Sequence, residues 1–210
     1  SEELAFSKTM LDGAGLNATK YLQSYREINK VLWRDVEMGK ISPQEVRLRR
    51  FEDLVQKERL DVDPKILADL FVEGLGNFGD LYNDARVVLE KLFRRVKLGL
   101  ITNGLSEVQR ARIKRLDLEQ YFDAIVISAE VGVAKPGKEI FDIILSQLNL
   151  PRIENILMIG DSLSSDIKGG NDFGISTCWY NPNNLSIRGN IYPTYQIREL
   201  CQLLKFVILR

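Results

Sequence analysis

From about Tyr82 onward, the chain alternates between short apolar runs and segments in which apolar residues have helix-like spacing. The apolar runs predict strands over residues 96–102, 124–128, 155–159 and 176–180. Runs of this kind, which have no polar face, are typical of parallel strands that are buried on both sides. Because strands and helices in alternation build an open sheet covered by helices, the sequence predicts an α/β fold with a doubly wound, Rossmann-like parallel sheet.

The first 79 residues differ from this pattern, because their apolar residues recur at separations that are mostly helix-like. Ser42, Pro43 and Glu45 predict a capping box with proline at the first helical position. The apolar side chains that carry the helical pattern are Leu4, Met10, Tyr21, Tyr25, Ile28, Leu32, Phe51, Leu54, Val55, Leu67, Leu70 and Phe71. We therefore predict two domains, an α-helical cap domain over residues 1–79 and an α/β core domain over residues 80–210.

Two acidic residues, Asp161 and Asp166, follow the predicted strand at 155–159. Open α/β sheets bind ligands beyond the carboxyl ends of their strands, and proteins usually hold Mg²⁺ through one or two carboxylates, with water and substrate phosphate completing the shell. Gly160 is expected to let the chain turn sharply after the strand. These residues alone fit an ordinary turn and capped helix equally well.

Thr102, Asn103 and Gly104 stand at the end of the predicted strand over 96–102. A hydroxyl and an amide at this position offer neutral hydrogen-bond donors to phosphate oxygens. The competing explanation is a helix start that Ser106 caps. Thr102 and Asn103 are therefore candidates for phosphate binding.

Lys135 lies between the predicted strand at 124–128 and a predicted helix at 139–148. Pro136 is expected to keep Lys135 extended and to fit the start of that helix. A lysine here can neutralise a phosphate, although most lysines are merely solvated. The residue is informative only in combination with the other strand ends.

Three strand ends in chain order thus carry Thr and Asn, then Lys, then a pair of Asp. This arrangement resembles the haloacid dehalogenase superfamily of phosphatases, whose second motif matches Thr102 and Asn103. Lys135 matches the third motif of the superfamily, and Asp161 with Asp166 matches the fourth. The conjunction is far more specific than any of its parts.

Within that superfamily, the chain is similar to the bacterial pyrimidine 5′-nucleotidases over essentially its whole length, the core more closely than the first 80 residues. The segments that carry this similarity are 25–33, 105–118, 126–141 and 177–179. The resemblance implies Mg²⁺-dependent hydrolysis of a phosphomonoester through an aspartyl-phosphate intermediate. It implies a small-molecule substrate, a pyrimidine nucleoside 5′-monophosphate.

The resemblance also implies a role for each candidate residue. Asp161 and Asp166 would bind Mg²⁺ directly or through water, while Lys135, Thr102 and Asn103 would be catalytic. Phosphate would be bound by Thr102, Asn103, Gly104 and Lys135.

The first motif of the superfamily, a strand ending in Asp-x-Asp that supplies the nucleophile and the acid/base, has no match here. The one Asp-x-Asp, at Asp61 and Asp63, follows polar residues and precedes Pro64, so a loop between two helices is expected. Our hypothesis is that the nucleophile strand lies upstream of Ser1. That strand belongs in the middle of the sheet, and its neighbours would have unpaired backbone groups without it.

A glycine-rich segment at 74–79 spells the dinucleotide-binding pattern Gly-x-Gly-x-x-Gly. The preceding residues 66–73 look helical, and no parallel strand follows with an acidic residue about 20 positions on. We expect a flexible hinge of the cap rather than a nicotinamide site.

Several aromatic residues of the predicted cap have helix-compatible spacing, namely Tyr21, Tyr25, Trp33 and Phe51. They fit either stacking against a nucleobase or plain packing in the core of the cap. The choice of a nucleotide as substrate therefore rests on the resemblance.

Composition removes several classes of function. The absence of histidine excludes Ser-His-Asp hydrolysis and His-ligated zinc. Lys plus Arg equal Asp plus Glu, at 29 each, so there is no overall field to attract nucleic acid or a membrane surface. No apolar stretch approaches the length of a membrane span. Cys178 and Cys201 lack metal-type spacing, and a cytoplasmic location is the simplest expectation.

The sequence also allows other functions. It does not distinguish a monomer from a homodimer. A 2-haloacid dehalogenase would share the fold and Lys135 but would need no metal. Another small-metabolite phosphatase of the same fold would differ in substrate. A dinucleotide-dependent oxidoreductase, which depends on the glycine-rich segment at 74–79, would bind a nicotinamide cofactor. A noncatalytic binding protein becomes the better explanation if the nucleophile is truly absent.

Overall fold

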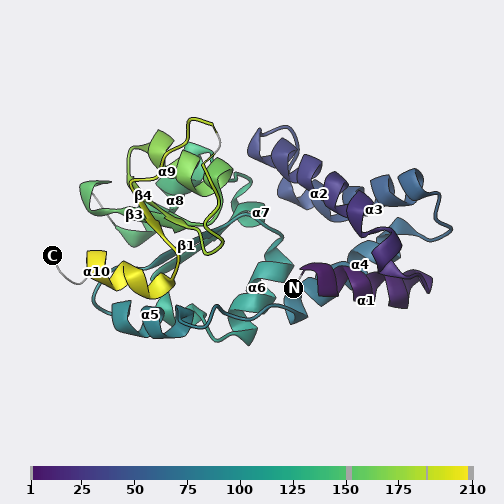
Figure 1. Ribbon diagram of the computed structural model, residues 1–210, viewed down its shortest axis with the longest axis horizontal. Coiled ribbons are helices and arrows are strands. Elements are labelled where there is room, and N and C mark those ends of the chain that lie inside the picture. Colours follow the sequence, from purple (N-terminus) through teal and green to yellow (C-terminus); the bar gives the residue numbers. More distant parts are fainter. Residues whose placement is uncertain (1, 150–152, 188, 208–210) are drawn as a thin grey trace. The chain divides into compact units, whose positions relative to one another are not determined.

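The computed structural model describes residues 2–149, 153–187 and 189–207, and these form two compact units (Figure 1). The first unit comprises Ser1–Asp80 with Thr102–Glu119 and Ile127–Ala134. The second unit comprises Leu81–Ile101, Gln120–Val126 and Lys135–Arg210. The predicted domain boundary at residue 79 stays a prediction.

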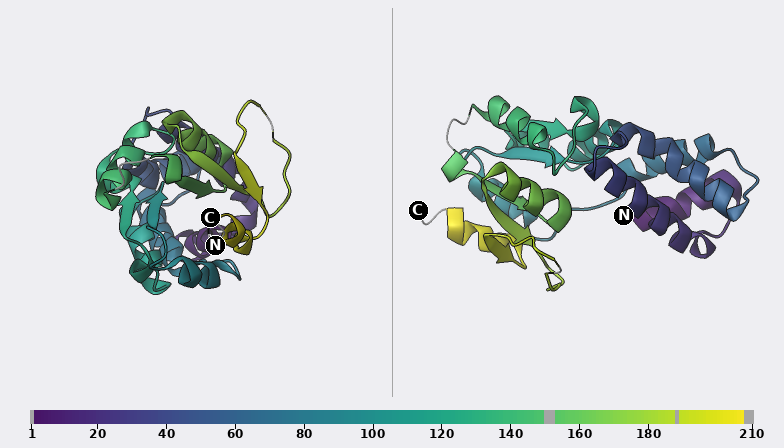
Figure 2. Two further views of the ribbon diagram at one scale, coloured as in Figure 1. Left: turned by 90° about the vertical axis from the view of Figure 1, so that its left-hand side faces the viewer. Right: turned by 90° about the horizontal axis from the view of Figure 1, so that it is seen from above.

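The first unit is helical from its start, as the sequence predicts. Its first 80 residues form four main helices, α1 (Glu2–Ala14), α2 (Leu22–Glu37), α3 (Pro43–Glu58) and α4 (Pro64–Asn77). Figure 2 shows these helices packed side by side. The two shorter helices of this unit are α6 (Ser106–Arg115) and α7 (Ser128–Val131).

Local sequence signals set the ends of these helices. Ser42 and Glu45 form the predicted capping box, in which each side chain bonds the backbone N–H of the other residue. Asp63 accepts a hydrogen bond from the backbone N–H of Lys65 at 2.8 Å and so caps α4. The prediction that Asp61 and Asp63 lie in a loop between helices is therefore confirmed.

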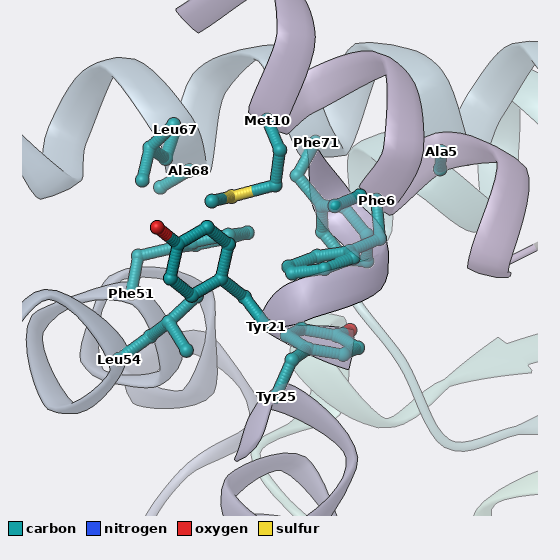
Figure 3. Packing of buried hydrophobic residues seen from close by; sticks show 11 residues of the cluster. Ala5, Phe6, Met10, Tyr21, Tyr25, Phe51, Leu54, Leu67, Ala68 and Phe71 are labelled. Carbon is teal, nitrogen blue, oxygen red and sulfur yellow. The ribbon is translucent and has the colours of Figure 1, made fainter. Parts of the chain in front are cut away.

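A cluster of apolar side chains, many of them aromatic, fills the core shared by the four helices α1 to α4 (Figure 3). Tyr25 lies against Phe6, with ring centroids 4.4 Å apart, and Phe71 meets both Tyr25 and Phe51 edge-on. Edge-to-face pairs of this kind add to the free energy gained from burial. Leu4 lies in α1 as predicted but takes no part in this core, because it is 61% exposed.

Two glycines of the predicted hinge lie inside α4 instead. A Cβ atom on Gly74 would come within 3.3 Å of the Ala5 backbone, and one on Gly76 would lie 3.1 Å from Ala111 Cβ. These glycines allow α1 and α6 to approach α4 closely. The hinge prediction is therefore wrong for Gly74 and Gly76. Of the three glycines in this segment, only Gly79 has a positive φ, 108°.

The second unit carries the parallel sheet. Strands β3 (Leu157–Gly160), β4 (Ser176–Tyr180) and β5 (Tyr195–Ile197) pair in parallel in that order. Strand β1 (Gly99–Thr102) pairs with β2 (Ala124–Ile127). The order of helices and parallel strands confirms the predicted α/β class.

The observed strands correct the predicted limits in three places. Residues 96–98 lie outside β1, β2 ends at 127 rather than 128, and β3 covers 157–160 rather than 155–159. Strand β5 was not predicted, because three residues after a long polar loop give no periodic signal. Strand β4 has the predicted limits.

Within the described residues, backbone pairing gives two separate pieces of sheet, β1–β2 and β3–β4–β5. This division is compatible with a middle strand supplied by other residues. The hypothesis that such a strand precedes Ser1 stays a prediction.

Helices surround the sheet of the second unit. They are α5 (Ala85–Leu92), α8 (Lys138–Leu148), α9 (Lys168–Phe173) and α10 (Leu204–Val207). Val88 and Leu92 of α5 pack with Cys178 and Tyr180 of β4 in a shared apolar core. In the described parts of both units, no helix has the length and apolar content to span a bilayer.

Candidate active site

A buried ion pair joins two of the predicted site residues, Lys135 and Asp166. Lys135 Nζ lies 2.7 Å from Asp166 Oδ1, and both side chains are almost fully shielded from solvent. Lys135 Nζ also donates a hydrogen bond to the Ile101 carbonyl at 2.9 Å, which places the amine beside the residue that precedes Thr102 in the chain. Pro136 does not begin the next helix as predicted, since α8 starts two residues later at Lys138.

A single π-helical turn, η4 (Leu163–Ile167), holds Asp166 in place. The backbone N–H of Ser162 donates to Asp166 Oδ2 at 3.0 Å, and Ser162 Oγ accepts from the Ser165 N–H at 3.2 Å. The turn thus points one carboxylate back toward the end of β3. Ser162 was missed as a site residue, although its place between two acidic candidates was visible.

Gly160 has a different role from the predicted sharp turn. Its φ is not in the left-handed region, and it is the last residue of β3. A Cβ atom at this position would lie 2.2 Å from Asp166 Oδ2, far inside van der Waals contact. Glycine is required here because the Asp166 carboxylate lies directly against the backbone.

Asp161 presents a contrasting environment, because its side chain is exposed. Its backbone carbonyl accepts a hydrogen bond from Trp179 Nε1 at 2.9 Å, which ties the loop to β4. The negative charge of Asp161 also contributes to the raised pKa of Tyr180, after burial and the nearby groups of Tyr82 and Asp84. The carboxylate is therefore accessible while its backbone is fixed.

The carboxylate oxygens near the end of β3 are of the kind that a hard divalent cation prefers as ligands. Asp166 Oδ1 is buried and, among the described residues, has no hydrogen bond besides its charge contact with Lys135. The described residues contain no group of three or more His, Cys, Asp or Glu placed to enclose a metal. Asp161 and Asp166 could provide two carboxylate ligands to Mg²⁺, which needs few carboxylates when water and phosphate complete its shell.

The first unit contains the other predicted residues, Thr102, Asn103 and Gly104. The backbone N–H of Gly104 donates to Ser128 Oγ at 3.0 Å, so this predicted phosphate donor has a partner within the chain. Ser128 directly follows β2, is fully buried and was not predicted as a residue that supports the site. Its position as a small hydroxyl residue directly after an apolar run is the sequence signal that could have identified it.

Helix α6, which follows these residues, is not capped by Ser106. Ser106 is the first helical residue, and its hydroxyl donates to Glu130 rather than accepting from the helix backbone. Arg110 donates two further hydrogen bonds to Glu130, and these lower the pKa of the Glu130 carboxyl. The capping explanation for this segment therefore fails, and Ser106 and Arg110 instead anchor α7 against α6.

A cavity of about 370 Å³ lies within the first unit, beside Asn103 and Gly104. Its other walls include Asn29 and Trp33 of α2 and Arg50 of α3. Of the four aromatic residues considered for base stacking, three belong to the apolar core: Tyr21, Tyr25 and Phe51. Only Trp33 lines this cavity, so the packing explanation holds for the others.

Comparisons with known proteins identify the family of this chain. The family model of haloacid dehalogenase-like hydrolases matches residues 4–174. Pyrimidine 5′-nucleotidase YjjG of Escherichia coli (strain K12) is 39% identical over 181 residues, which cover 86% of this chain and 80% of that protein. Pyrimidine 5′-nucleotidase PynA of Streptococcus pneumoniae is 33% identical and covers 97% of this chain and 86% of its own.

A solved structure shows the same similarity in three dimensions. The HAD-hydrolase YfnB from Bacillus subtilis, whose crystal structure has bound magnesium and reveals interdomain movement, superposes with a TM-score of 0.87. It is 32% identical in sequence, and the match covers 98% of this chain and 90% of that chain. With the family model matching most of the sequence, this chain belongs to the haloacid dehalogenase-like hydrolases.

Proposed function

We propose that this hydrolase removes phosphate from pyrimidine nucleoside 5′-monophosphates in a Mg²⁺-dependent reaction. The observation that carries the phosphatase proposal is the buried pair of Lys135 and Asp166 beside an exposed second carboxylate, Asp161. The nucleotide part is supported by the similarity to two proteins named pyrimidine 5′-nucleotidases.

Lys135 acts on the charge of the phosphoryl group. Its ammonium group is held in a low-dielectric environment by Asp166 and the Ile101 carbonyl. A charge pair at about 4 Å and an effective dielectric near 20 is worth roughly 4 kcal/mol. A contribution of this size makes Lys135 a strong catalytic candidate.

Thr102 and Asn103 orient phosphoryl oxygens through their hydroxyl and amide groups. Gly104 was expected to join them, but direct binding by its N–H would first require loss of the hydrogen bond to Ser128. We therefore assign phosphate contact to Thr102, Asn103 and Lys135, with Gly104 as a support of the loop.

Asp161 and Asp166 hold the metal ion in this proposal. Bound Mg²⁺ supplies charge neutralisation at a phosphate oxygen. Asp166 has its Oδ2 fixed by Ser162, and the exposed Asp161 can adjust its carboxylate to an incoming ion.

The nucleophile is proposed to be an aspartate outside the printed sequence, which forms an aspartyl-phosphate that water cleaves. The one Asp-x-Asp in the chain is unsuited to this role, because Asp63 caps α4 with its carboxylate. Intact mass and N-terminal sequencing of the active protein test this assignment. An active protein whose mass equals that of residues 1–210 alone would contradict it.

A phosphate-release panel tests the proposed substrate. Uridine, thymidine and cytidine monophosphates are compared with sugar phosphates and phosphoglycolate at equal concentrations, with Mg²⁺ present. We expect the highest kcat/KM for the pyrimidine nucleotides. If sugar phosphates lead the panel, the nucleotidase assignment is wrong while the phosphatase assignment stands.

A further inference from the structure

We propose that the cavity beside Asn103 binds a uracil or thymine ring, with Asn29 Oδ1 accepting the ring N3–H and the Trp33 indole stacking on the ring. This inference rests on the proposed function, because it takes the substrate to be a pyrimidine nucleotide. It assigns the choice of base to α2 of the first unit.

The orientation of the Asn29 amide is set by its neighbour. Asn29 Nδ2 donates to Glu2 Oε1 at 2.8 Å, and an ionised carboxylate can only accept hydrogen bonds. Oδ1 must therefore face away from Glu2. It is buried and has no hydrogen-bond partner among the residues that the structure describes.

An unpaired buried acceptor destabilises a protein unless something pairs with it. Asn29 lines the cavity, yet its Oδ1 is shielded from water in the chain without ligand. A ligand N–H that reaches Oδ1 after a side-chain rotation would supply the missing hydrogen bond. Rotamer changes of this kind are common on binding.

Trp33 lies one helical turn after Asn29, so both side chains project from the same face of α2. Its ring packs partly against a small apolar cluster of Leu32, Val36 and Val46. Trp33 also lines the cavity. A flat ring that enters beside Asn29 therefore finds an aromatic face next to a hydrogen-bond acceptor.

Arg50 supplies positive charge to the same cavity and is itself fixed. Its side chain is 2% exposed, and its Nε donates to the Val46 carbonyl while Nη1 donates to the Tyr25 hydroxyl. Burial raises the pKa of Tyr25, so its hydroxyl stays protonated and donates to Glu2. A cation beside an acceptor suits a uracil edge, where carbonyl oxygens flank the N3–H.

The size of the cavity admits a nucleobase. At about 370 Å³ it lies near the lower end of the range for small-molecule sites, about 300 to 1,000 Å³. The choice of base is therefore assigned to Asn29 and Trp33 rather than to volume.

The test compares three substrates with the full-length enzyme: uridine monophosphate, its N3-methyl analogue and p-nitrophenyl phosphate. Wild-type enzyme should prefer uridine monophosphate to the N3-methyl analogue by about 10- to 100-fold in kcat/KM. Asn29→Leu should lose most of this preference, mainly through KM, with p-nitrophenyl phosphate hydrolysis changed less than about twofold. Asn77→Leu, on the exposed end of α4, is the matched control and should behave as wild type.

The outcomes separate this inference from the proposed function. If wild type hydrolyses uridine monophosphate and its N3-methyl analogue equally, the inference is overturned even if Asn29→Leu does not fold. The same holds if the preference persists in a folded Asn29→Leu. If wild type cleaves p-nitrophenyl phosphate but no pyrimidine nucleotide, the proposed function and the inference both fail. Trp33→Phe should retain more activity toward uridine monophosphate than Trp33→Leu.

Discussion

Lys135 differs from an ordinary lysine, whose side chain is exposed to solvent. It is buried, lies 2.7 Å from Asp166 and donates to a backbone carbonyl. We predict that Lys135→Ala lowers kcat by several orders of magnitude, because the phosphoryl charge loses its cation. Steady-state phosphate release measures the loss, and exposed Lys138→Ala is the control. A loss of tenfold or less would assign Lys135 to structure alone.

The free energy of unfolding provides a second test of the Lys135–Asp166 pair, one that does not depend on activity. Removing one member of a buried ion pair leaves the other charge uncompensated, at a cost of about 3 to 5 kcal/mol. Chemical unfolding of Lys135→Ala should therefore show a lower free energy of unfolding than wild type. The double variant Lys135→Ala/Asp166→Ala should recover part of this loss, because no unpaired charge then stays buried.

Gly160 offers a test of the close approach between β3 and Asp166. Gly160→Ala places a Cβ where Asp166 Oδ2 lies, 2.2 Å away, so the carboxylate must move. We predict weaker Mg²⁺ binding and a stability loss of about 1 to 3 kcal/mol. Gly99→Ala in β1 is the control, because its Cβ meets only the side-chain ends of Leu148 and Ile144. Equal Mg²⁺ affinity in Gly160→Ala and wild type would contradict the role given to this glycine.

At the scale of elements, strands with continuous apolar runs were predictable and the short edge strand was not. Strand β4 is almost wholly buried, and its apolar sequence gave its limits. Strand β5 has three residues and pairs with β4 after a long loop, so its position depends on tertiary contacts. The strand ends predicted Lys135 and Asp166 because carboxyl ends of parallel strands meet at one edge of a sheet. Ser128 and Asn29 depend on side-chain contacts between distant segments, which no local pattern contains.

The burial of β4 has a direct chemical consequence for its cysteine. Burial raises the pKa of Cys178 to about 11. Desolvation and the nearby Glu199 carboxylate also raise the pKa of Cys201, but its side chain is exposed. We predict that iodoacetamide at pH 8 labels Cys201 and leaves Cys178 unmodified in the native protein, because only the Cys201 sulfur is exposed to the reagent and burial suppresses the reactive thiolate of Cys178. Peptide mapping by mass spectrometry before and after unfolding measures both sites. Native labelling of Cys178 at the rate of Cys201 would show that β4 opens readily.

The raised pKa also sets the direction of a pH effect on the whole fold. The Cys178 thiol has an ordinary pKa of 9.0 and a folded pKa of about 11, so the native state binds the proton more tightly. The stability contributed by the neutral thiol is complete below pH 9 and declines as the pH rises through the folded value. A Cys178→Ser variant should lack this particular decline.

For the molecule as a whole, the proposed metal ion would connect stability with activity. A ligand that binds only the folded state stabilises it by about 2.7 kcal/mol at 100 times its Kd. We predict that EDTA abolishes phosphate release and that Mg²⁺ both restores it and raises Tm. Asp161→Asn should lose both responses while its own Tm without metal stays near wild type, because this side chain is exposed.

The control for this experiment is Asp142→Asn, an exposed carboxylate on α8 that should keep both responses. Measuring Tm with and without Mg²⁺ separates a metal-binding defect from a catalytic one, since the shift needs no substrate. A metal-free protein that releases halide from a 2-haloacid but releases no phosphate would argue for the haloacid dehalogenase reaction, which shares Lys135 and needs no cation. A Mg²⁺-induced shift that survives in Asp161→Asn would instead leave Asp166 as the principal ligand, because its fixed carboxylate needs no movement to receive the ion.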